Sequence, residues 1–285
     1  MSWQILVLLS VVLISFGGIL QKVVMKDQRS DPWAYSITFQ FLVGVFVATY
    51  GFAFSDMTLP TNIRPLIPNL VLMVLLWSAN NILLFSALKR IEASIFTVIF
   101  STRSLFTTLA SSLFLSEFLS RRQFVGAFFI LLGAVFVTFT KKTGFKFDKG
   151  IIYAVLATAA FGFANTNDRV LLGSFNLYPY ITLAFVLPSL FLVFVKPSSV
   201  YNLKLFTNFN ILKKMILLCL IYALASIAFF RALQIAPNSS QVATISVTSV
   251  VLTVFLSIIF LKERENMGRK IIGALSAFIG LLLVS

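Results

Sequence analysis

The sequence predicts an all-α integral membrane protein with ten transmembrane helices arranged as two inverted five-helix repeats. Of its 285 residues, 59% are hydrophobic and only 11% are charged, whereas a soluble domain carries about 25% charged residues. Apolar segments about 20 residues long recur along the chain, and the two halves of the sequence align with each other. These observations exclude a water-soluble globular domain.

Ten segments are long and apolar enough to be predicted as membrane spans. The hydrocarbon core of a bilayer is about 30 Å thick and a helix rises about 1.5 Å per residue, so one span needs about 20 residues. Charged residues and turn residues mark the ends. The predicted spans are 3–25, 33–54, 66–88, 93–116, 122–140, 150–172, 178–195, 213–233, 238–261 and 267–285.

Several of these spans have a recognisable boundary. The first begins at Trp3 with no cleavage signature before it, so we expect it to remain in the mature protein. Prolines precede or open the second, seventh and ninth spans, where proline suits a helix start. The eighth span is free of charge only over 215–230, so Lys213 and Lys214 would have to snorkel toward water.

Motifs recur in the two halves at offsets of 145 to 147 residues. We expect a first repeat over 1–142 and a second over 147–285. Because five helices is an odd number, the second copy would enter the membrane from the opposite face. The matched motifs are Phe85-x-Ala87-Leu88 with Phe230-x-Ala232-Leu233, Leu115-x-Glu117 with Leu261-x-Glu263, Gly126-Ala127 with Gly273-Ala274, and Pro32 with Pro179.

The net charge of +14 is interpreted as a topology signal. Of the 23 Lys and Arg residues, 17 fall on the face opposite the termini, five fall on the face that holds the termini, and Arg103 lies inside a span. Positive loops favour the cytoplasm, so this bias places both termini outside. The basic face is expected to contact anionic lipid headgroups, and no nucleic-acid partner is predicted.

Residues that support catalysis or metal binding are scarce. The chain has no His and a single cysteine, Cys219. Zinc clusters, catalysis by His and internal disulfides are therefore excluded. We expect no enzyme activity, no cofactor and no metal site.

Arg103 is the strongest candidate for a substrate-binding residue. It lies near the middle of the fourth span, where a charge persists only if it faces a cavity, has a partner or serves the function. Its guanidinium could bind a carboxylate, phosphate or sulfonate through two hydrogen bonds. The structural alternative is an internal ion pair or bonds to backbone carbonyls.

Asp168 is the candidate proton-coupling residue, because the other acids lie in loops or at helix ends. Burial can bring a carboxyl into a range where it titrates near neutral pH, but a neighbouring Arg opposes this. Arg169 is adjacent, so the favoured interpretation of Asp168 is an ion pair with Arg169 at the end of the sixth helix, ahead of coupling.

Further polar side chains interrupt the apolar spans. Amide groups in hydrocarbon must be hydrogen-bonded, either to substrate and water or, more commonly, to other helices. Gly17 and Gly18, with Gly162 at a corresponding place in the second half, form a hinge hypothesis. The additional candidates for substrate binding are Gln40, Trp77, Asn80, Asn81, Asn165 and Gln241.

With these motifs the chain resembles the drug/metabolite transporter superfamily, in particular its ten-helix EamA-like members. The resemblance covers essentially the whole chain and rests on the Ala-Leu turn, the Leu-x-Glu and the Gly-Ala that recur in both halves. It departs at Arg103 and Ser249, because many members carry a proline inside the fourth and ninth helices. The resemblance also implies termini in the cytoplasm, opposite to the charge bias.

Together, the repeat and the resemblance imply a secondary active transporter of small organic metabolites, anionic or zwitterionic, that works by alternating access. The expected location is the plasma or inner membrane, as a multi-pass monomer or homodimer whose partners are a small-molecule substrate and the lipid bilayer. The alternative is a flippase or scramblase for a lipid or lipid-linked precursor, because a cationic face and abundant Phe suit amphiphiles equally well.

Overall fold

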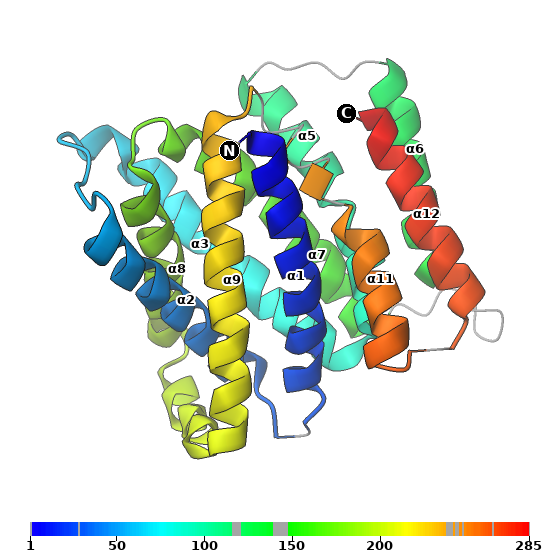
Figure 1. Ribbon diagram of the computed structural model, residues 1–285, viewed down its shortest axis with the longest axis horizontal. Helices are drawn as coiled ribbons and strands as arrows, with labels where there is room; N and C mark the ends of the chain where they lie inside the picture. The colour runs from blue at the N-terminus through cyan, green and yellow to red at the C-terminus, as the bar shows by residue number, and fades with distance from the viewer. Residues whose placement is uncertain are drawn as a thin grey trace.

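The structure of the protein is a computed structural model that describes residues 2–27, 29–115, 121–138, 148–237, 242, 245–246, 248–263 and 265–284. Within these ranges the secondary structure consists of helices joined by short loops, and no strand occurs (Figure 1). The elements are α1 (Trp3–Met25), α2 (Pro32–Phe54), η1 (Arg64–Leu66), α3 (Ile67–Arg90), α4 (Ala93–Phe100), α5 (Arg103–Leu115), α6 (Arg121–Thr138), α7 (Lys149–Leu172), α8 (Leu177–Val195), η2 (Pro197–Thr207), α9 (Phe209–Ile235), α11 (Ser249–Phe260) and α12 (Met267–Val284).

Six segments of the described chain are long and apolar enough to cross a membrane. They comprise α1, α2, α3 with η1, α4 joined to most of α5, α8 and α9. The all-helical membrane fold is therefore confirmed, whereas the count of ten spans stays a prediction.

Each helix of the first half packs mainly against a helix of the second half. The principal pairs are α1 with α9, α3 with α7, α2 with α8, and α6 with α12. In Figure 1, α1 and α9 run in opposite directions side by side, as do α6 and α12. The exchange of partners is symmetric, because the first helix of each half meets the third helix of the other.

Two glycines allow α6 and α12 to approach at backbone distance. A Cβ atom at Gly280 would lie 2.5 Å from the carbonyl oxygen of Gly126, and one at Gly133 would lie 2.5 Å from the carbonyl oxygen of Gly273. The two contacts are reciprocal, because Gly133 and Gly280 are 147 residues apart in the sequence, as are Gly126 and Gly273. Small residues of this kind permit close helix packing in membranes, where apolar burial gives little driving force.

We therefore expect Gly280→Val to destabilise the protein by about 3 kcal/mol, because backbone atoms cannot move aside for the new side chain. Thermal or detergent-induced unfolding of the purified protein measures the effect. Gly268→Val is the matched control, since Gly268 lies in the same helix with open space around its Cβ position. Equal stability of the two variants would contradict this packing.

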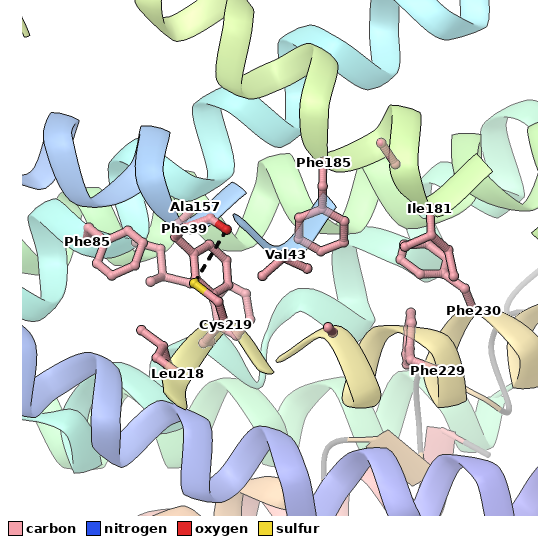
Figure 2. Close-up of a cluster of buried hydrophobic side chains, with 14 of the residues drawn as sticks. Phe39, Val43, Phe85, Ala157, Ile181, Phe185, Leu218, Cys219, Phe229 and Phe230 are labelled. Atoms are coloured by element: carbon pink, nitrogen blue, oxygen red, sulfur yellow. Dashed lines mark hydrogen bonds between the residues drawn. The ribbon is translucent and has the colours of Figure 1, made fainter. Parts of the chain in front are cut away.

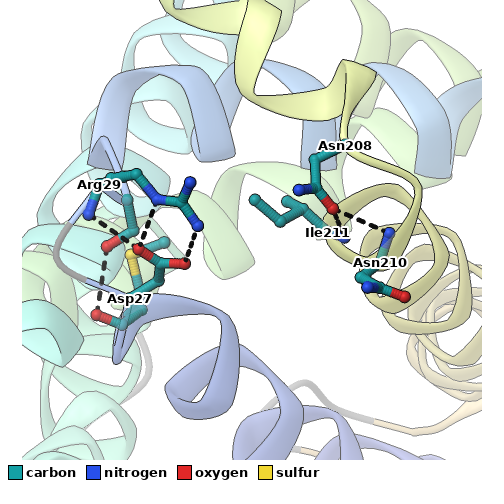
Figure 3. Close-up of polar contacts among 7 residues, drawn as sticks. Asp27, Arg29, Asn208, Asn210 and Ile211 are labelled. Atoms are coloured by element: carbon teal, nitrogen blue, oxygen red, sulfur yellow. Dashed lines mark hydrogen bonds and ion pairs between the residues drawn. The ribbon is translucent and has the colours of Figure 1, made fainter.

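Three helices are capped by the side chain of the residue just before their first turn. Asp31 accepts a hydrogen bond from the Trp33 backbone N–H at 3.0 Å, and Asp148 accepts one from Gly150 at 2.7 Å. Asn208 accepts bonds from the backbone of Asn210 and Ile211 (Figure 3). These are helix N-caps. Because of the Asn208 cap, α9 begins at Phe209, four residues before the predicted start at 213.

The loop between α1 and α2 is closed by a local ion pair. Arg29 donates to both carboxylate oxygens of Asp27, at 3.3 and 3.1 Å (Figure 3). This side-chain hydrogen bond lowers the pKa of Asp27 below its usual value. The pair lies at the surface, where such contacts add little stability.

The main hydrophobic core is built from buried residues of α1, α2, α3, α4, α7, α8 and α9. Figure 2 shows Phe39, Val43 and Phe185 facing Cys219 and its neighbour Leu218. The Cys219 thiol lies 3.8 Å from the carbonyl oxygen of Phe39 and is buried. The single cysteine therefore serves as an apolar core residue.

The fourth span is not the continuous helix predicted over 93–116. It breaks into α4 and α5 at Ser101 and Thr102. The ninth span, predicted over 238–261, is likewise interrupted, because Thr248 forms a turn before α11 begins at Ser249. Neither break contains proline or glycine, so composition gave no indication of them.

Hydroxyl groups satisfy the backbone at both breaks. Thr102 Oγ1 donates to the carbonyl oxygen of Ile99 at 2.8 Å, and Thr248 Oγ1 donates to that of Ile245 at 2.7 Å. The two contacts are 146 residues apart and are equivalent in the two halves. Ser and Thr side chains of this kind replace lost helix bonds inside a membrane.

Candidate functional site

The break in the fourth span places Arg103 at the first position of α5, buried with 6% of its surface exposed. Its guanidinium carbon lies 4.9 Å from the centroid of the Phe100 ring and 4.8 Å from that of Phe161. Nη2 makes two long contacts to Ser246, at 3.4 Å to the carbonyl oxygen and 3.3 Å to the hydroxyl. The Nε atom is buried without a hydrogen bond.

No carboxylate in the described ranges forms an ion pair with Arg103. The two salt bridges found there join Arg29 to Asp27 and Lys270 to Glu92. The ion-pair alternative for Arg103 is therefore not seen among the described residues, whose contacts with the guanidinium are two aromatic faces and the Ser246 oxygens. Cation–π contacts of this kind stabilise a desolvated guanidinium, but they leave its N–H groups available.

Arg103 lines a central cavity of about 100 Å³, which is large enough for several waters or a small organic group. Both halves contribute to its wall, with Asn80 and Asn81 from α3 and Ala225 and Ser226 from α9. These two pairs match at an offset of 145 residues. Aromatic side chains make up much of the remaining lining, including Phe39, Trp77, Phe161, Tyr222, Phe229 and Phe230.

A second cavity of about 50 Å³ adjoins the first and shares Gln21, Phe100, Arg103 and Tyr222 with it. Arg103 thus borders both spaces. A third space of about 510 Å³ is lined by Lys22, Met25, Lys26, Lys89, Glu92, Leu261, Lys262, Glu263 and Glu265. Several of these residues are sequence neighbours of residues that line the second cavity, such as Lys22 beside Gln21 and Glu92 beside Ala93.

Asp168 lies behind the cavity wall and is fully buried. The indole N–H of Trp77 donates to its two carboxylate oxygens at 3.1 and 3.2 Å, and the hydroxyl of Tyr180 donates to Oδ1 at 2.5 Å. Trp77 itself lines the central cavity. A single side chain therefore separates the carboxyl group from the cavity.

The predicted ion pair between Asp168 and Arg169 is wrong. Arg169 points toward the end of α9, where it donates to the carbonyl oxygens of Leu233, Ala236 and Pro237 at 2.6 to 3.0 Å. Successive residues of a helix point about 100° apart, so the two neighbours face different helices. Lys22 makes the equivalent contacts in the first half, donating to Leu88 and Ile91 at 2.6 Å.

A second hydrogen bond between helices corresponds to the one between Trp77 and Asp168. The hydroxyl of Tyr222 donates to Gln21 at 2.9 Å, so α9 is joined to α1 as α3 is joined to α7. Tyr222 follows Trp77 by 145 residues, and Asp168 follows Gln21 by 147. The two hydrogen bonds are therefore equivalent, but only the one at Asp168 contains an ionisable carboxyl group.

Of the other predicted site residues, some line the central cavity and others lie outside it. Asn81 donates to the carbonyl oxygen of Trp77 at 3.0 Å, and Asn80 Oδ1 is buried without a hydrogen bond. Gln40 is outside the cavity lining and donates to the same Trp77 oxygen at 3.1 Å. Asn165 is fully buried, its amide makes no hydrogen bond within the described chain, and it is also absent from this wall. Gln241 lies outside the described residues.

The three glycines of the hinge hypothesis lie in unbroken helices. A Cβ atom at Gly17 would lie 2.4 Å from the ring of Tyr222, and one at Gly162 would lie 2.4 Å from Phe106 Cβ. At Gly18 the nearest atom would be 3.8 Å away, in Thr253. Gly17 and Gly162 thus permit close packing against different partners. Their role as a hinge stays a prediction.

Gln21, Tyr222 and Ser226 are site residues that sequence reasoning missed. Gln21 stands near the end of the first span, and Tyr222 is one aromatic residue among many in the chain. The internal repeat could have identified them, because Gln21, Tyr222 and Ser226 are the repeat counterparts of Asp168, Trp77 and Asn81. Those three residues were predicted as site residues from the sequence. Transferring the selected residues from one half to the other would have found them.

Comparison with known proteins is consistent with this architecture. Residues 1–139 and again 148–285 match the EamA-like transporter family. A solved structure described only as the crystal structure of a protein aligns with a TM-score of 0.67 at 14% identity, covering 99% of this chain and 96% of that one. At this identity the likeness concerns the fold alone. The comparison with curated proteins gave no match.

Proposed function

The chain belongs to the EamA-like transporter family, and from this premise we propose that it is a secondary active transporter of small anionic or zwitterionic metabolites. The observation that carries the proposal is Arg103, a buried cation with no carboxylate partner in the described chain, on the wall of a cavity that both halves line. The transporter would act in the cell membrane.

The proposed architecture is ten membrane helices in two inverted repeats, with domains over 1–142 and 147–285. The symmetric exchange of helix partners supports it, as do the opposite directions of α1 and α9. Inverted repeats of this kind hold their substrate near the midplane, between the halves and beside broken helices. Arg103 and Ser249, which follow the two breaks, line the cavities described above, and this supports such a site.

In this proposal Arg103 anchors the negative group of the substrate, and Trp77, Asn80 and Asn81 contact the rest of it. Alternating access would require the two halves to rock about the cavity. The hydrogen bonds from Trp77 to Asp168 and from Tyr222 to Gln21 each join the two halves beside the cavity. Each would have to break if the two helices that it joins moved apart.

Asp168 is proposed to couple transport to protons. Its carboxyl is buried, receives hydrogen bonds from two neutral donors, Trp77 and Tyr180, and has no cationic partner among the described side chains. Trp77 connects it to the cavity. This arrangement supports coupling better than the ion pair with Arg169 that the sequence favoured.

Arg103→Ala is expected to abolish binding and transport of an anionic substrate while the protein still inserts and folds. The variant removes the cation in the cavity wall and leaves the aromatic lining in place. A thermal-shift screen against organic acids, amino acids, nucleosides, sugars and lipids would first identify a ligand, because a bound ligand stabilises the folded state. Wild-type transport by the Ala variant in proteoliposomes would reject the proposal.

The lipid-flipping alternative would require a groove that joins the site to the bilayer. A lateral groove of about 730 Å³ does exist, lined by leucines of α1 and α9 and, at its polar end, by Asp56, Asn176 and Arg231. Arg103 and the two asparagines are not part of its lining. A small soluble substrate therefore fits the cavity better, and scrambling of lipid reporters by the purified protein would reverse this preference.

A further inference from the structure

We infer that the ligand of the central cavity is an aromatic monocarboxylate carrying a hydrogen-bond donor on its ring, and that amino acids are excluded. This inference rests on the proposed function and narrows its substrate class from anionic or zwitterionic metabolites to one kind of organic anion. It follows from four properties of the described cavity wall: its charge, the unpaired Nε of Arg103, its aromatic content and the unpaired Oδ1 of Asn80.

The charge of the wall favours a single negative group. Among the residues that the structure describes, Arg103 is the only charged member of the cavity lining, and no Asp or Glu belongs to it. Asp168 lies behind Trp77, and its two oxygens already accept bonds from Trp77 and Tyr180. The ammonium group of an amino acid would therefore lose its water and enter beside a guanidinium without an anionic partner, which is costly.

The geometry of Arg103 favours a carboxylate. Phe100 and Phe161 lie 4.9 and 4.8 Å from the guanidinium carbon and restrict its orientation. Within the described chain, Nε has no hydrogen-bond partner and Nη2 makes long contacts to Ser246 alone. These adjacent N–H groups form one edge of the guanidinium. A carboxylate can accept from both at once, in the bidentate geometry that arginine prefers.

The body of the ligand must suit a wall rich in aromatic rings. Apart from Phe100 and Phe161, the lining includes Phe39, Trp77, Phe185, Tyr222, Phe229 and Phe230. Several of these rings meet edge to face, for example Phe39 with Tyr222 at 4.9 Å between centroids. An aromatic ring in the ligand can extend this packing, because edge-to-face pairs add to the burial of apolar surface.

Asn80 supplies the second polar contact. Its side chain is 3% exposed and lines the cavity, and its Oδ1 accepts no hydrogen bond from any described residue. A buried acceptor without a partner is unfavourable, so a ligand that donates a hydrogen bond there gains affinity. A ring hydroxyl or ring N–H meets this requirement, whereas an unsubstituted phenyl ring does not.

The test compares ligands that differ by one group, by isothermal titration calorimetry on the wild-type protein in detergent. 3-Phenylpropionate is expected to bind at least about 20-fold more tightly than phenylalanine, which adds only the ammonium group, and than 3-phenylpropionamide, which lacks the charge. 3-(4-Hydroxyphenyl)propionate should bind about fivefold more tightly than 3-phenylpropionate. Butyrate, which lacks the ring, should bind more weakly than 3-phenylpropionate and 3-(4-hydroxyphenyl)propionate.

Two variants assign the selectivity to the cavity. Arg103→Gln should reduce binding of 3-phenylpropionate at least about 20-fold, and Asn80→Ala should remove the advantage of the ring hydroxyl. Arg231→Gln is the matched control, because this exposed arginine of α9 lies outside the cavity lining. If Arg103→Gln does not fold, the wild-type ligand series still decides the question.

Tighter binding of phenylalanine than of 3-phenylpropionate would overturn the inference, as would equal binding of butyrate or of the amide. Failure of the inference can be separated from failure of the proposed function. If proteoliposomes of the wild type exchange an aliphatic acid or an amino acid and Arg103→Gln prevents it, the transporter proposal stands and the aromatic monocarboxylate is excluded.

Discussion

Asp168→Asn is expected to abolish uptake driven by a pH gradient and to preserve exchange of substrate for substrate. The reason is chemical, because an amide keeps the size and the accepting oxygen of the carboxyl group but cannot carry a proton. Tyr180 and Trp77 can still donate to the Asn oxygen, so the packing around α7 should be retained. Uptake of radiolabelled substrate into proteoliposomes, with and without a gradient, measures both activities.

Gln21→Ala provides the control for this prediction. It removes the equivalent hydrogen bond from Tyr222 in the other half but no carboxyl group, so any change it causes should be the same with and without the gradient. Gradient-driven uptake at the wild-type rate by the Asp168→Asn protein would remove Asp168 from the coupling mechanism.

Glu263→Ala is expected to lower the free energy of unfolding by about 4 kcal/mol, because two buried backbone donors would lose a charged acceptor. The Glu263 carboxylate accepts from the backbone of Ala93 at 3.0 Å and of Ser94 at 3.1 Å, and from the Ser94 hydroxyl at 2.7 Å. It thereby connects the end of α11 to the start of α4. Denaturant unfolding in mixed micelles measures the loss.

Glu265→Ala is the matched control for Glu263, because Glu265 lies two residues away and is exposed. Glu263→Gln should give an intermediate loss, since one accepting oxygen remains. If all three variants unfold at the same denaturant concentration, the contact from Glu263 to α4 does not stabilise the protein. Glu117, the counterpart of Glu263 in the first half, lies outside the described residues.

The sequence predicted much of the fold, because a bilayer constrains length and polarity strongly. The starts at Trp3 and at Ala93 agree with the structure, and the second helix begins at Pro32, one residue before the predicted 33. The break at Ser101 could not be predicted, since these residues also occur inside regular helices. It depends on hydroxyl-to-carbonyl bonds that only the folded backbone reveals.

The candidate site was predictable where a residue type is unusual in hydrocarbon and unpredictable where a contact depends on helix rotation. Arg103 and Asp168 were selected because charges in a span are costly. The partner of Asp168 was misjudged, because adjacency in sequence suggested Arg169 whereas the helix directs that side chain toward α9. Gln21 attracted no attention, although the repeat equates it with Asp168.

The breaks beside Arg103 and Ser249 differ from a proline kink in one respect that matters for movement. A proline ring lacks its N–H permanently, so the helix bond that it removes cannot be restored. At Thr102 and Thr248 every backbone N–H is retained, and a hydroxyl competes for the carbonyl only while its rotamer allows it. Rotation of the χ1 angles of Thr102 and Thr248 would therefore allow each broken span to become a continuous helix and to break again.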